Sequence, residues 1–264
     1  MSFAISSLQN PRIKELRLLM EKSRERKETG QFVIDGWKEI LMARAAGYYI
    51  RQLFVRDGST YKKEIDEIWP EGRPESVLVF RDIFDKLAYR GVTSGAIAIA
   101  ESREHRLEDL QPGAHPLILV IDGVEKPGNL GAMIRTADAT GADAVICCDT
   151  ATDVYNPNVI RSSVGCVFGV PIAVADRHST LSWLKERGIR IYTTSLKASV
   201  TYIQADLVDP SAIVLGTEAT GVDPIWETVS DQNIILPMRG KNDSLNVSNT
   251  AAVLLYEALR QRGI

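Results

Sequence analysis

The sequence predicts an α/β protein of two domains, the second of them built on a parallel sheet. In the C-terminal half, short apolar runs alternate with helical segments, a pattern typical of a parallel sheet covered by helices on both faces. The first hundred residues form a smaller series of short helices and strands. A polar stretch at 101–116, which contains Pro112-Gly113, separates the two series and is typical of a linker. We therefore expect one domain at 1–105, a linker at 106–115 and a second domain at 116–264.

The elements of the first domain follow from local patterns. Asn10-Pro11 favours a helix start, and the apolar residues that follow recur at helical spacing. A second helix, at 37–46, ends before Gly47, a residue that commonly closes helices. Short apolar runs rich in branched residues indicate the strands of this domain, at 32–34, 50–55, 77–80 and 96–100.

The second domain shows longer helices between more continuous apolar runs. Such runs are typical of strands that are buried on both faces. The expected strands lie at 117–121, 144–147, 189–192, 213–215 and 234–236, and the expected helices at 130–140, 180–187 and 247–262.

Composition narrows the class of protein. With 264 residues, 45% apolar and 25% charged, the chain resembles an ordinary globular protein. It lacks an apolar run of the roughly 18–20 residues that cross a bilayer, and its first residues lack a secretion signal. Cys147, Cys148 and Cys166 are odd in number and without C-x-x-C spacing, which favours reduced thiols. Three scattered histidines argue against a metal cluster. These features predict a cytoplasmic protein with no metal and no membrane segment.

Charge is distributed unevenly along the chain. The net charge is −3, yet basic residues outnumber acidic ones within the first thirty residues. Arg24, Arg26 and Lys27 are therefore candidates for contacts with nucleic-acid phosphates. A solvated helix face with paired charges explains the same pattern equally well.

Three expected strand ends carry the polar residues that could form a site, because open α/β sheets bind ligands at the carboxyl ends of their strands. The first is 122–131, where Asn129 is a plausible helix N-cap and Arg135 lies within reach of the helix start. In the second, Gly216 permits close backbone approach and Glu218 follows the turn. Each also has an ordinary reading as a turn or cap.

The third strand end is 234–240, where Pro237 stops the strand because proline cannot donate to a ladder. Ser244 and Asn246 then stand at the start of the last helix, where both residue types cap well. The chain lacks the glycine-rich fingerprints of dinucleotide and P-loop sites and the nucleophile elbow of hydrolases. These absences argue against nucleotidyl transfer and hydrolysis.

In order and spacing, three segments resemble the motifs of the TrmH (SpoU) branch of the SPOUT methyltransferases. They are 127–138 (PGNLGAMIRTAD), 215–218 (LGTE) and 236–248 (LPMRGKNDSLNVS), and the stretch 155–165 resembles the family's intermediate segment. The resemblance covers residues 116–264. More weakly, residues 26–36 resemble the small α/β RNA-binding domain that often precedes the catalytic one.

The resemblance implies a parallel sheet with a deep trefoil knot, a homodimer, and methyl transfer from S-adenosyl-L-methionine to a ribose 2′-hydroxyl of RNA. The residues implied as catalytic are Arg135, Asn129, Glu218, Ser244 and Asn246. Those implied to contact the cofactor are Thr194, Ser195, Leu196, Leu215, Gly216, Leu236, Met238, Leu245 and Asn246. The expected RNA contacts are Arg24, Arg26, Lys27, Lys126 and Arg135.

The roles expected of these residues follow from the reaction. Arg135 stays protonated, so we expect it to bind phosphate and to stabilise oxyanion character near the hydroxyl. Asn129 and Asn246 would orient it and the ribose, with Ser244 in support. Glu218 would shape its loop or pair with a cation. The family usually has Asp or Asn where this chain has Lys126, a departure that could alter substrate choice.

Two other functions are compatible with the sequence. One is a catalytically silent RNA-binding or ribosome-assembly protein that keeps the fold, and the other is a methyltransferase that acts on a base. Both ribosomal RNA and transfer RNA fit as substrates, and the N-terminal domain favours ribosomal RNA.

Overall fold

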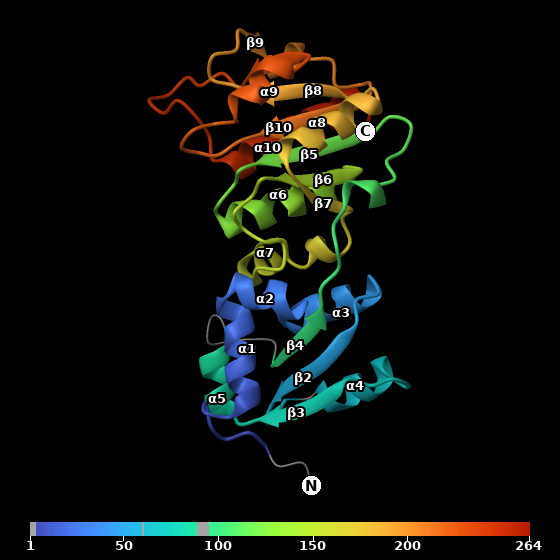
Figure 1. The fold of residues 1–264 in the computed structure, drawn as a ribbon, viewed down its shortest axis with the longest axis vertical. Coiled ribbons are helices and arrows are strands. Elements are labelled where there is room, and N and C mark those ends of the chain that lie inside the picture. The colour runs from blue at the N-terminus through green and yellow to red at the C-terminus, as the bar shows by residue number, and fades with distance from the viewer. Residues whose placement is uncertain (1–3, 60, 89–94) are drawn as a thin grey trace. The chain divides into compact units, whose positions relative to one another are not determined.

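The computed structural model describes residues 4–59, 61–88 and 95–264, and the chain divides into two compact units. The first unit holds the chain up to Arg103 together with the segment Tyr155–Gly169. The second holds Glu104–Val154 and Val170–Ile264. The chain thus leaves the first unit, returns to it for one short segment and then completes the second. Each unit has its own sheet (Figure 1).

A four-stranded sheet in the order β1-β4-β2-β3 forms the centre of the first unit. β2 and β3 are parallel, whereas β4 runs antiparallel to β1 and β2. Asn10 caps α1 by accepting a hydrogen bond from the backbone N–H of Arg12, and Pro11 takes the first helical position. The elements are α1 (Pro11–Glu21), α2 (Ser23–Thr29), β1 (Gln31–Asp35), α3 (Trp37–Ala45), β2 (Ile50–Arg56), α4 (Tyr61–Ile68), β3 (Glu75–Val79), α5 (Arg81–Leu87) and β4 (Ala96–Glu101).

The segment Tyr155–Gly169 is attached to the first unit by aromatic contacts. The ring of Tyr155 stacks on Phe32 of β1 with centroids 4.2 Å apart, and its hydroxyl lies 3.2 Å from that of Tyr48. Phe168 also packs against the rings of Phe32 and Tyr48. The segment contains α7 (Pro157–Ser162) and the 3-10 turn η2 (Cys166–Phe168).

A seven-stranded parallel sheet in the order β7-β6-β5-β10-β8-β11-β9 forms the second unit. Since all its strands are parallel, their carboxyl ends lie along one edge. The strands are β5 (Leu117–Asp122), β6 (Ala144–Cys148), β7 (Ile172–Ala175), β8 (Arg190–Thr194), β9 (Val200–Thr201), β10 (Ser211–Leu215) and β11 (Gln232–Ile235). The helical elements are η1 (Leu107–Asp109), α6 (Pro127–Thr140), α8 (Arg177–Glu186), η3 (Tyr202–Gln204), α9 (Pro224–Val229) and α10 (Val247–Gln261).

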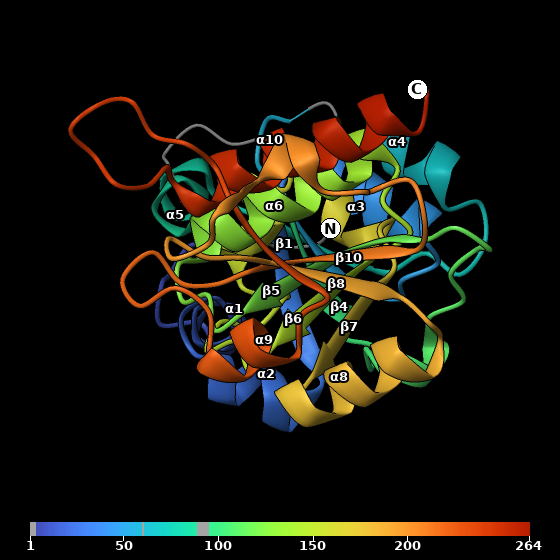
Figure 2. The ribbon, with the colours of Figure 1, turned by 90° about the horizontal axis from the view of Figure 1, so that it is seen from above.

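Helices cover both faces of this sheet. Ile118 and Val120 of β5 lie in the apolar cluster that includes Trp183 of α8 and Trp226 of α9. α6 and α10 pack against each other, and Figure 2 shows them on the face opposite α8 and α9. Coverage on both faces explains why the central strands are continuous apolar runs in the sequence.

The strands and helices expected from the sequence are present, with ends that differ by a few residues. One difference corrects a predicted role. α6 begins at Pro127 with Lys126 as its N-cap, so Asn129 lies inside the first turn and does not cap the helix. Several short elements were not indicated by the sequence patterns, namely the helices α2, α4, α5, α7 and α9 and the strands β7 and β9. Of these, β7 is an edge strand whose Val174 is exposed.

The three cysteines are buried and form no disulfide. Burial raises the pKa of Cys147 and of Cys148 to about 12, so both thiols stay protonated near neutral pH. Every described helix is too short or too polar to cross a membrane. Residues 4–59, 61–88 and 95–264 hold no group of three His, Cys, Asp or Glu side chains suited to a metal ion.

Candidate active site

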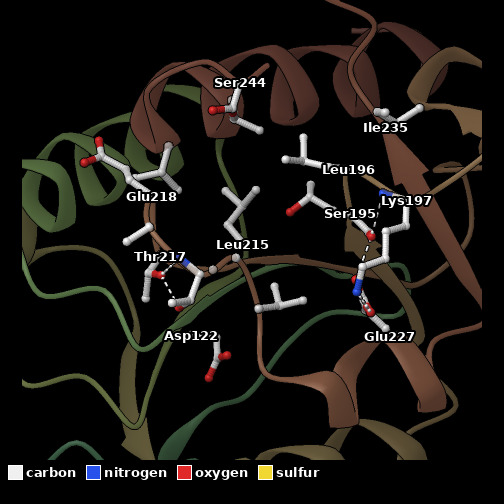
Figure 3. Close-up of a pocket in the computed structure, with 18 of the residues that line it drawn as sticks. Asp122, Ser195, Leu196, Lys197, Leu215, Thr217, Glu218, Glu227, Ile235 and Ser244 are labelled. Carbon is white, nitrogen blue, oxygen red and sulfur yellow. Dashed lines mark hydrogen bonds and ion pairs between the residues drawn. The ribbon is translucent and has the colours of Figure 1, made fainter. Parts of the chain in front are cut away.

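A cavity of about 660 Å³ lies at the carboxyl edge of the seven-stranded sheet. Its walls are the loops that follow β8, β10 and β11, together with the first turn of α10 (Figure 3). Parallel α/β sheets bind ligands at this edge. The cavity thus brings together the second and third segments singled out in the sequence.

Glu218 is the centre of a hydrogen-bonded cluster at one end of the cavity. Its Oε1 accepts hydrogen bonds from the amide of Asn129 (2.9 Å) and from that of Asn246 (2.5 Å), and its Oε2 forms an ion pair with Lys126. These contacts lower the pKa of Glu218. The contact with Lys126 has the largest effect, and that with Asn129 the next largest. The cluster therefore presents an ionised carboxylate with two amides oriented around it.

The orientation of Asn246 follows from helix capping. Its Oδ1 accepts from the backbone N–H (3.0 Å) and the hydroxyl (2.6 Å) of Ser248 at the start of α10. Because the amide oxygen is engaged in the cap, the amide nitrogen faces Glu218 and Asn129. The predicted cap at Asn246 is confirmed, and it also fixes the position of a polar group in the site.

Gly216 is required by the tight loop after β10. Thr217 and Gly221 exchange backbone hydrogen bonds of 2.8 and 3.1 Å, which close the loop on itself. A Cβ added at Gly216 would lie 2.2 Å from the carbonyl of Gly221 and 2.3 Å from the nitrogen of Val222. Only glycine lets this loop close and place Glu218 beside α6 and α10.

A network of charged side chains holds the far end of the loop that follows β10. Asp122, at the end of β5, is 2% exposed and accepts from Arg177 Nε (2.8 Å) and from the backbone N–H of Asp223 (2.9 Å). Arg177 also pairs with Asp149 at 2.9 Å. Asp223 is the N-cap of α9, so the network joins β5, α8 and α9 beneath the cavity. Both oxygens of the buried carboxylate have partners, as a buried charge requires.

A second polar group lies on the far wall of the cavity. Ser195, which follows β8, donates a 2.6 Å hydrogen bond to Glu227 of α9, and Lys197 lies 3.5 Å from the other oxygen of that carboxylate. Figure 3 shows this group opposite Glu218, with Leu196 and Leu215 between them. The cavity therefore has an apolar middle and a polar group at each end.

The structure brings together most of the residues expected at the site. Thr194, Ser195, Leu196, Leu215, Gly216, Leu236, Met238 and Leu245 all line the cavity. Of the residues expected to be catalytic, Glu218 and Ser244 line it, and Asn129 and Asn246 bond to Glu218. Arg135 is exposed on α6, as its ninth residue, outside the cavity lining.

The expected RNA contacts differ in their exposure. Lys126 is 70% exposed, and Arg24, which pairs with Glu28, is 87% exposed. Lys27 is also exposed. Arg26, in contrast, is only 4% exposed and donates to the carbonyl oxygens of Leu19 (2.7 Å) and Met20 (3.3 Å). Its guanidinium joins α2 to the end of α1 and is buried there, which corrects its assignment as a phosphate contact.

Arg177 and Glu227 were not among the predicted site residues, and no role was predicted for Asp122. Asp122 carried a signal, since it is a charged residue at the end of an apolar run. Arg177 and Glu227 carried none, because their place at the cavity depends on the strand order that brings α8 and α9 beneath the loops.

Comparison with known families gives two matches. Residues 116–256, more than half of the chain, match the SpoU rRNA Methylase family. Residues 10–98 match the MRM3-like substrate binding domain.

Relatives match the chain over almost its whole length. The 23S rRNA (guanosine(2553)-2′-O)-methyltransferase RlmP of Bacillus subtilis is 30% identical over 252 residues, which cover 96% of this chain and 97% of that protein. A crystal structure of an RNA 2′-O ribose methyltransferase is 39% identical, with a TM-score of 0.85, and covers 99% of this chain and 100% of that one. The SpoU methyltransferase AviRb of Streptomyces viridochromogenes, in complex with S-adenosylmethionine, is 28% identical with a TM-score of 0.86, over 96% and 99% of the two chains. The chain belongs to the SpoU rRNA methylase family.

Proposed function

We propose that this enzyme transfers a methyl group from S-adenosylmethionine to a ribose 2′-hydroxyl of 23S ribosomal RNA. The observation that carries the proposal is the cavity in which Gly216 and the Glu218 cluster meet the first turn of α10. The names of the full-length relatives support the choice of ribosomal RNA and of the ribose as the methylated group.

The cavity residues fit the cofactor. Leu215, Leu236 and Leu245 provide an apolar wall suited to an adenine ring, and Gly216 allows the ligand to approach the backbone closely. When bound, the cofactor supplies an electrophilic methyl group on a sulfonium sulfur. Carboxylates outnumber cations in the cavity lining, which suits a cationic ligand: the acidic residues are Asp122, Glu218, Asp223, Glu227 and Asp243, and the basic ones are Arg177 and Lys197.

The chain's own residues must orient the ribose and favour loss of its hydroxyl proton. Amide groups of Asn129 and Asn246, fixed by Glu218 and by the cap of α10, are placed to hold the ribose. The guanidinium of Arg135 would bind an RNA phosphate and stabilise oxyanion character at the hydroxyl. Most of the rate would then come from positioning.

The exposed cations Arg24, Lys27 and Lys126 would contact RNA phosphates.

We expect a homodimer in which Arg135, exposed outside the cavity, can serve the site of a second copy. In a trefoil knot, the segment that joins β11 to α10 would be threaded through the loops that precede it in the chain. An enzyme that modifies ribosomal RNA would work in the cytoplasm.

The direct test is methylation of 23S ribosomal RNA transcripts with radiolabelled cofactor, followed by digestion to nucleosides. We expect 2′-O-methylated ribose, and at least a hundredfold lower turnover for Arg135→Ala with unchanged cofactor affinity. Arg187→Ala, an exposed change at the end of α8, is the control. Near-normal turnover by Arg135→Ala would remove its catalytic role.

Two outcomes would replace the proposal. Base-methylated nucleosides would identify a base methyltransferase. Absence of cofactor binding in calorimetry, together with RNA binding, would identify a silent RNA-binding protein that keeps the fold.

A further inference from the structure

Glu227 lies on the cavity wall opposite the Glu218 cluster and has no assigned role. Its side chain, on α9, is 28% exposed, and it faces the loop that follows β8 (Figure 3). The hydroxyl of Ser195 donates to Oε1 at 2.6 Å, and the ammonium of Lys197 lies 3.5 Å from Oε2.

Ser195 is held so that it orients this carboxylate. Its backbone N–H donates to the carbonyl of Ile234 at 3.0 Å, and its hydroxyl oxygen accepts from the backbone N–H of Lys197 at 3.1 Å. With its oxygen engaged in this way, the hydroxyl hydrogen is directed at Glu227. The C-terminal end of α9 is fixed too, because Asn233 donates to the carbonyl of Glu227 at 2.9 Å.

The carboxylate keeps capacity for further hydrogen bonds. An ionised carboxylate offers about four acceptor positions, and the two contacts described use one on each oxygen. The contact with Ser195, and to a lesser extent that with Lys197, lowers the pKa of Glu227. An acceptor pair that is charged and rigidly held in a cavity suits a ligand with two adjacent donors.

The proposed function supplies such a ligand. The reacting methyl group belongs at the Glu218 end, where Asn129 and Asn246 lie, and the apolar middle suits adenine. The remaining donor pair of adenosine is its vicinal ribose diol, a group that carboxylates bind in other nucleotide sites. We propose that Glu227 binds the cofactor by accepting hydrogen bonds from both ribose hydroxyls, with Ser195 as its positioning residue. This inference rests on the proposed function.

Calorimetry with two stable ligands tests it. Both ligands carry adenine and the ribose diol. S-adenosylhomocysteine also carries the amino-acid group, which 5′-methylthioadenosine lacks. We expect Glu227→Gln to weaken both ligands by about tenfold or more, since hydrogen bonds to a charged acceptor are lost. Thr228→Ala, an exposed neighbour on α9, is the matched control and should bind both ligands like the wild type.

The 2′-deoxyribose analogue of 5′-methylthioadenosine is a third ligand for calorimetry. With it, a ligand hydroxyl and the Glu227 carboxylate can be removed separately and together. Removal of the 2′-hydroxyl should weaken binding to the wild type but leave the affinity of Glu227→Gln almost unchanged. A residue with only a structural role would not show this coupling. Thermal unfolding midpoints close to the wild type would confirm that the variants fold.

Other outcomes overturn the assignment in distinct ways. Equal affinities of wild type and Glu227→Gln would remove Glu227 from the cofactor site. Loss confined to S-adenosylhomocysteine would assign the carboxylate to the α-ammonium group in place of the diol. Failure of the wild type to bind either ligand would contradict the proposed function itself.

Discussion

At the scale of single residues, the ion pair between Lys126 and Glu218 acts on the site more than on stability. Both side chains are partly exposed, and surface pairs of this kind contribute only about 0–1 kcal/mol. The same Glu218 oxygen accepts from both Asn129 and Asn246, so its ionisation holds two amides in place. Lys126 favours the ionised form of Glu218 and thereby keeps the cluster assembled.

Replacement of Lys126 should change the pH dependence of methyl transfer. Lys126 lowers the pKa of Glu218, so Lys126→Ala raises that pKa and Glu218 becomes protonated at a higher pH. We expect the acid limb of the pH–rate profile, measured at saturating RNA, to move to higher pH in Lys126→Ala. Lys126→Arg should restore the wild-type limb, and Lys185→Ala on α8 should leave it unchanged. Superimposable acid limbs for Lys126→Ala and the wild type would contradict this role.

At the scale of elements, the site depends on the backbone of one loop. The loop after β10 closes through the Thr217–Gly221 hydrogen bonds, and Asp122 accepts from the backbone of Asp223 at its far end. Glu218 is thus presented by a loop fixed at both ends. The space above Gly216 is filled by this same loop.

Gly216→Ala should therefore disrupt the cavity. The added Cβ would meet backbone atoms of residues 221 and 222 at 2.2–2.3 Å, so the loop must open. We expect cofactor affinity to fall by more than tenfold in calorimetry and the unfolding midpoint to fall by several degrees. Gly240→Ala, where a Cβ meets no atom within 4 Å, is the control. Wild-type affinity in Gly216→Ala would show that the loop tolerates the change.

The elements also show what sequence patterns can predict. Strands β5, β6 and β10 could be predicted because they are continuous apolar runs, buried on both faces. β7 and α9 were missed because one is a four-residue edge strand and the other has six residues.

The residues of the site also differ in whether the sequence alone could reveal them. Gly216 and Glu218 could be found because motif order placed them at a strand end. Glu227 could not, since its contact with Ser195 depends on how α9 packs. Arg26 was misassigned because a positive charge in a sequence does not reveal that its guanidinium is buried against carbonyl oxygens.

At the scale of the whole molecule, α10 has an apolar side that stays uncovered in the single chain. Val253 is 36% exposed and Tyr256 is 54% exposed, while Leu254 and Leu255 are fully buried. Exposed apolar side chains gathered on one helix are typical of protein interfaces. They support the proposed homodimer.

Charges introduced on that side should dissociate the dimer. We expect the wild type to sediment as a dimer and Val253→Glu/Tyr256→Glu to sediment as a monomer, because a buried unpaired carboxylate is costly at an interface. Methyl transfer should fall with dissociation if Arg135 serves a second copy. Ser182→Glu, an exposed change on α8, should leave the mass unchanged. A wild type that sediments as a monomer would contradict the proposal.

The late position of Asn246 in the chain has a consequence for the timing of activity. This residue reaches back 117 positions to Asn129, and α10 packs on α6. During synthesis, β5 and α6 emerge and can fold long before α10 exists. A nascent chain therefore lacks both the cap that orients Asn246 and the first turn of α10 that closes the cavity. If the proposed function holds, the enzyme stays inert toward the ribosome that is translating it, and activity begins only once this segment has emerged and docked.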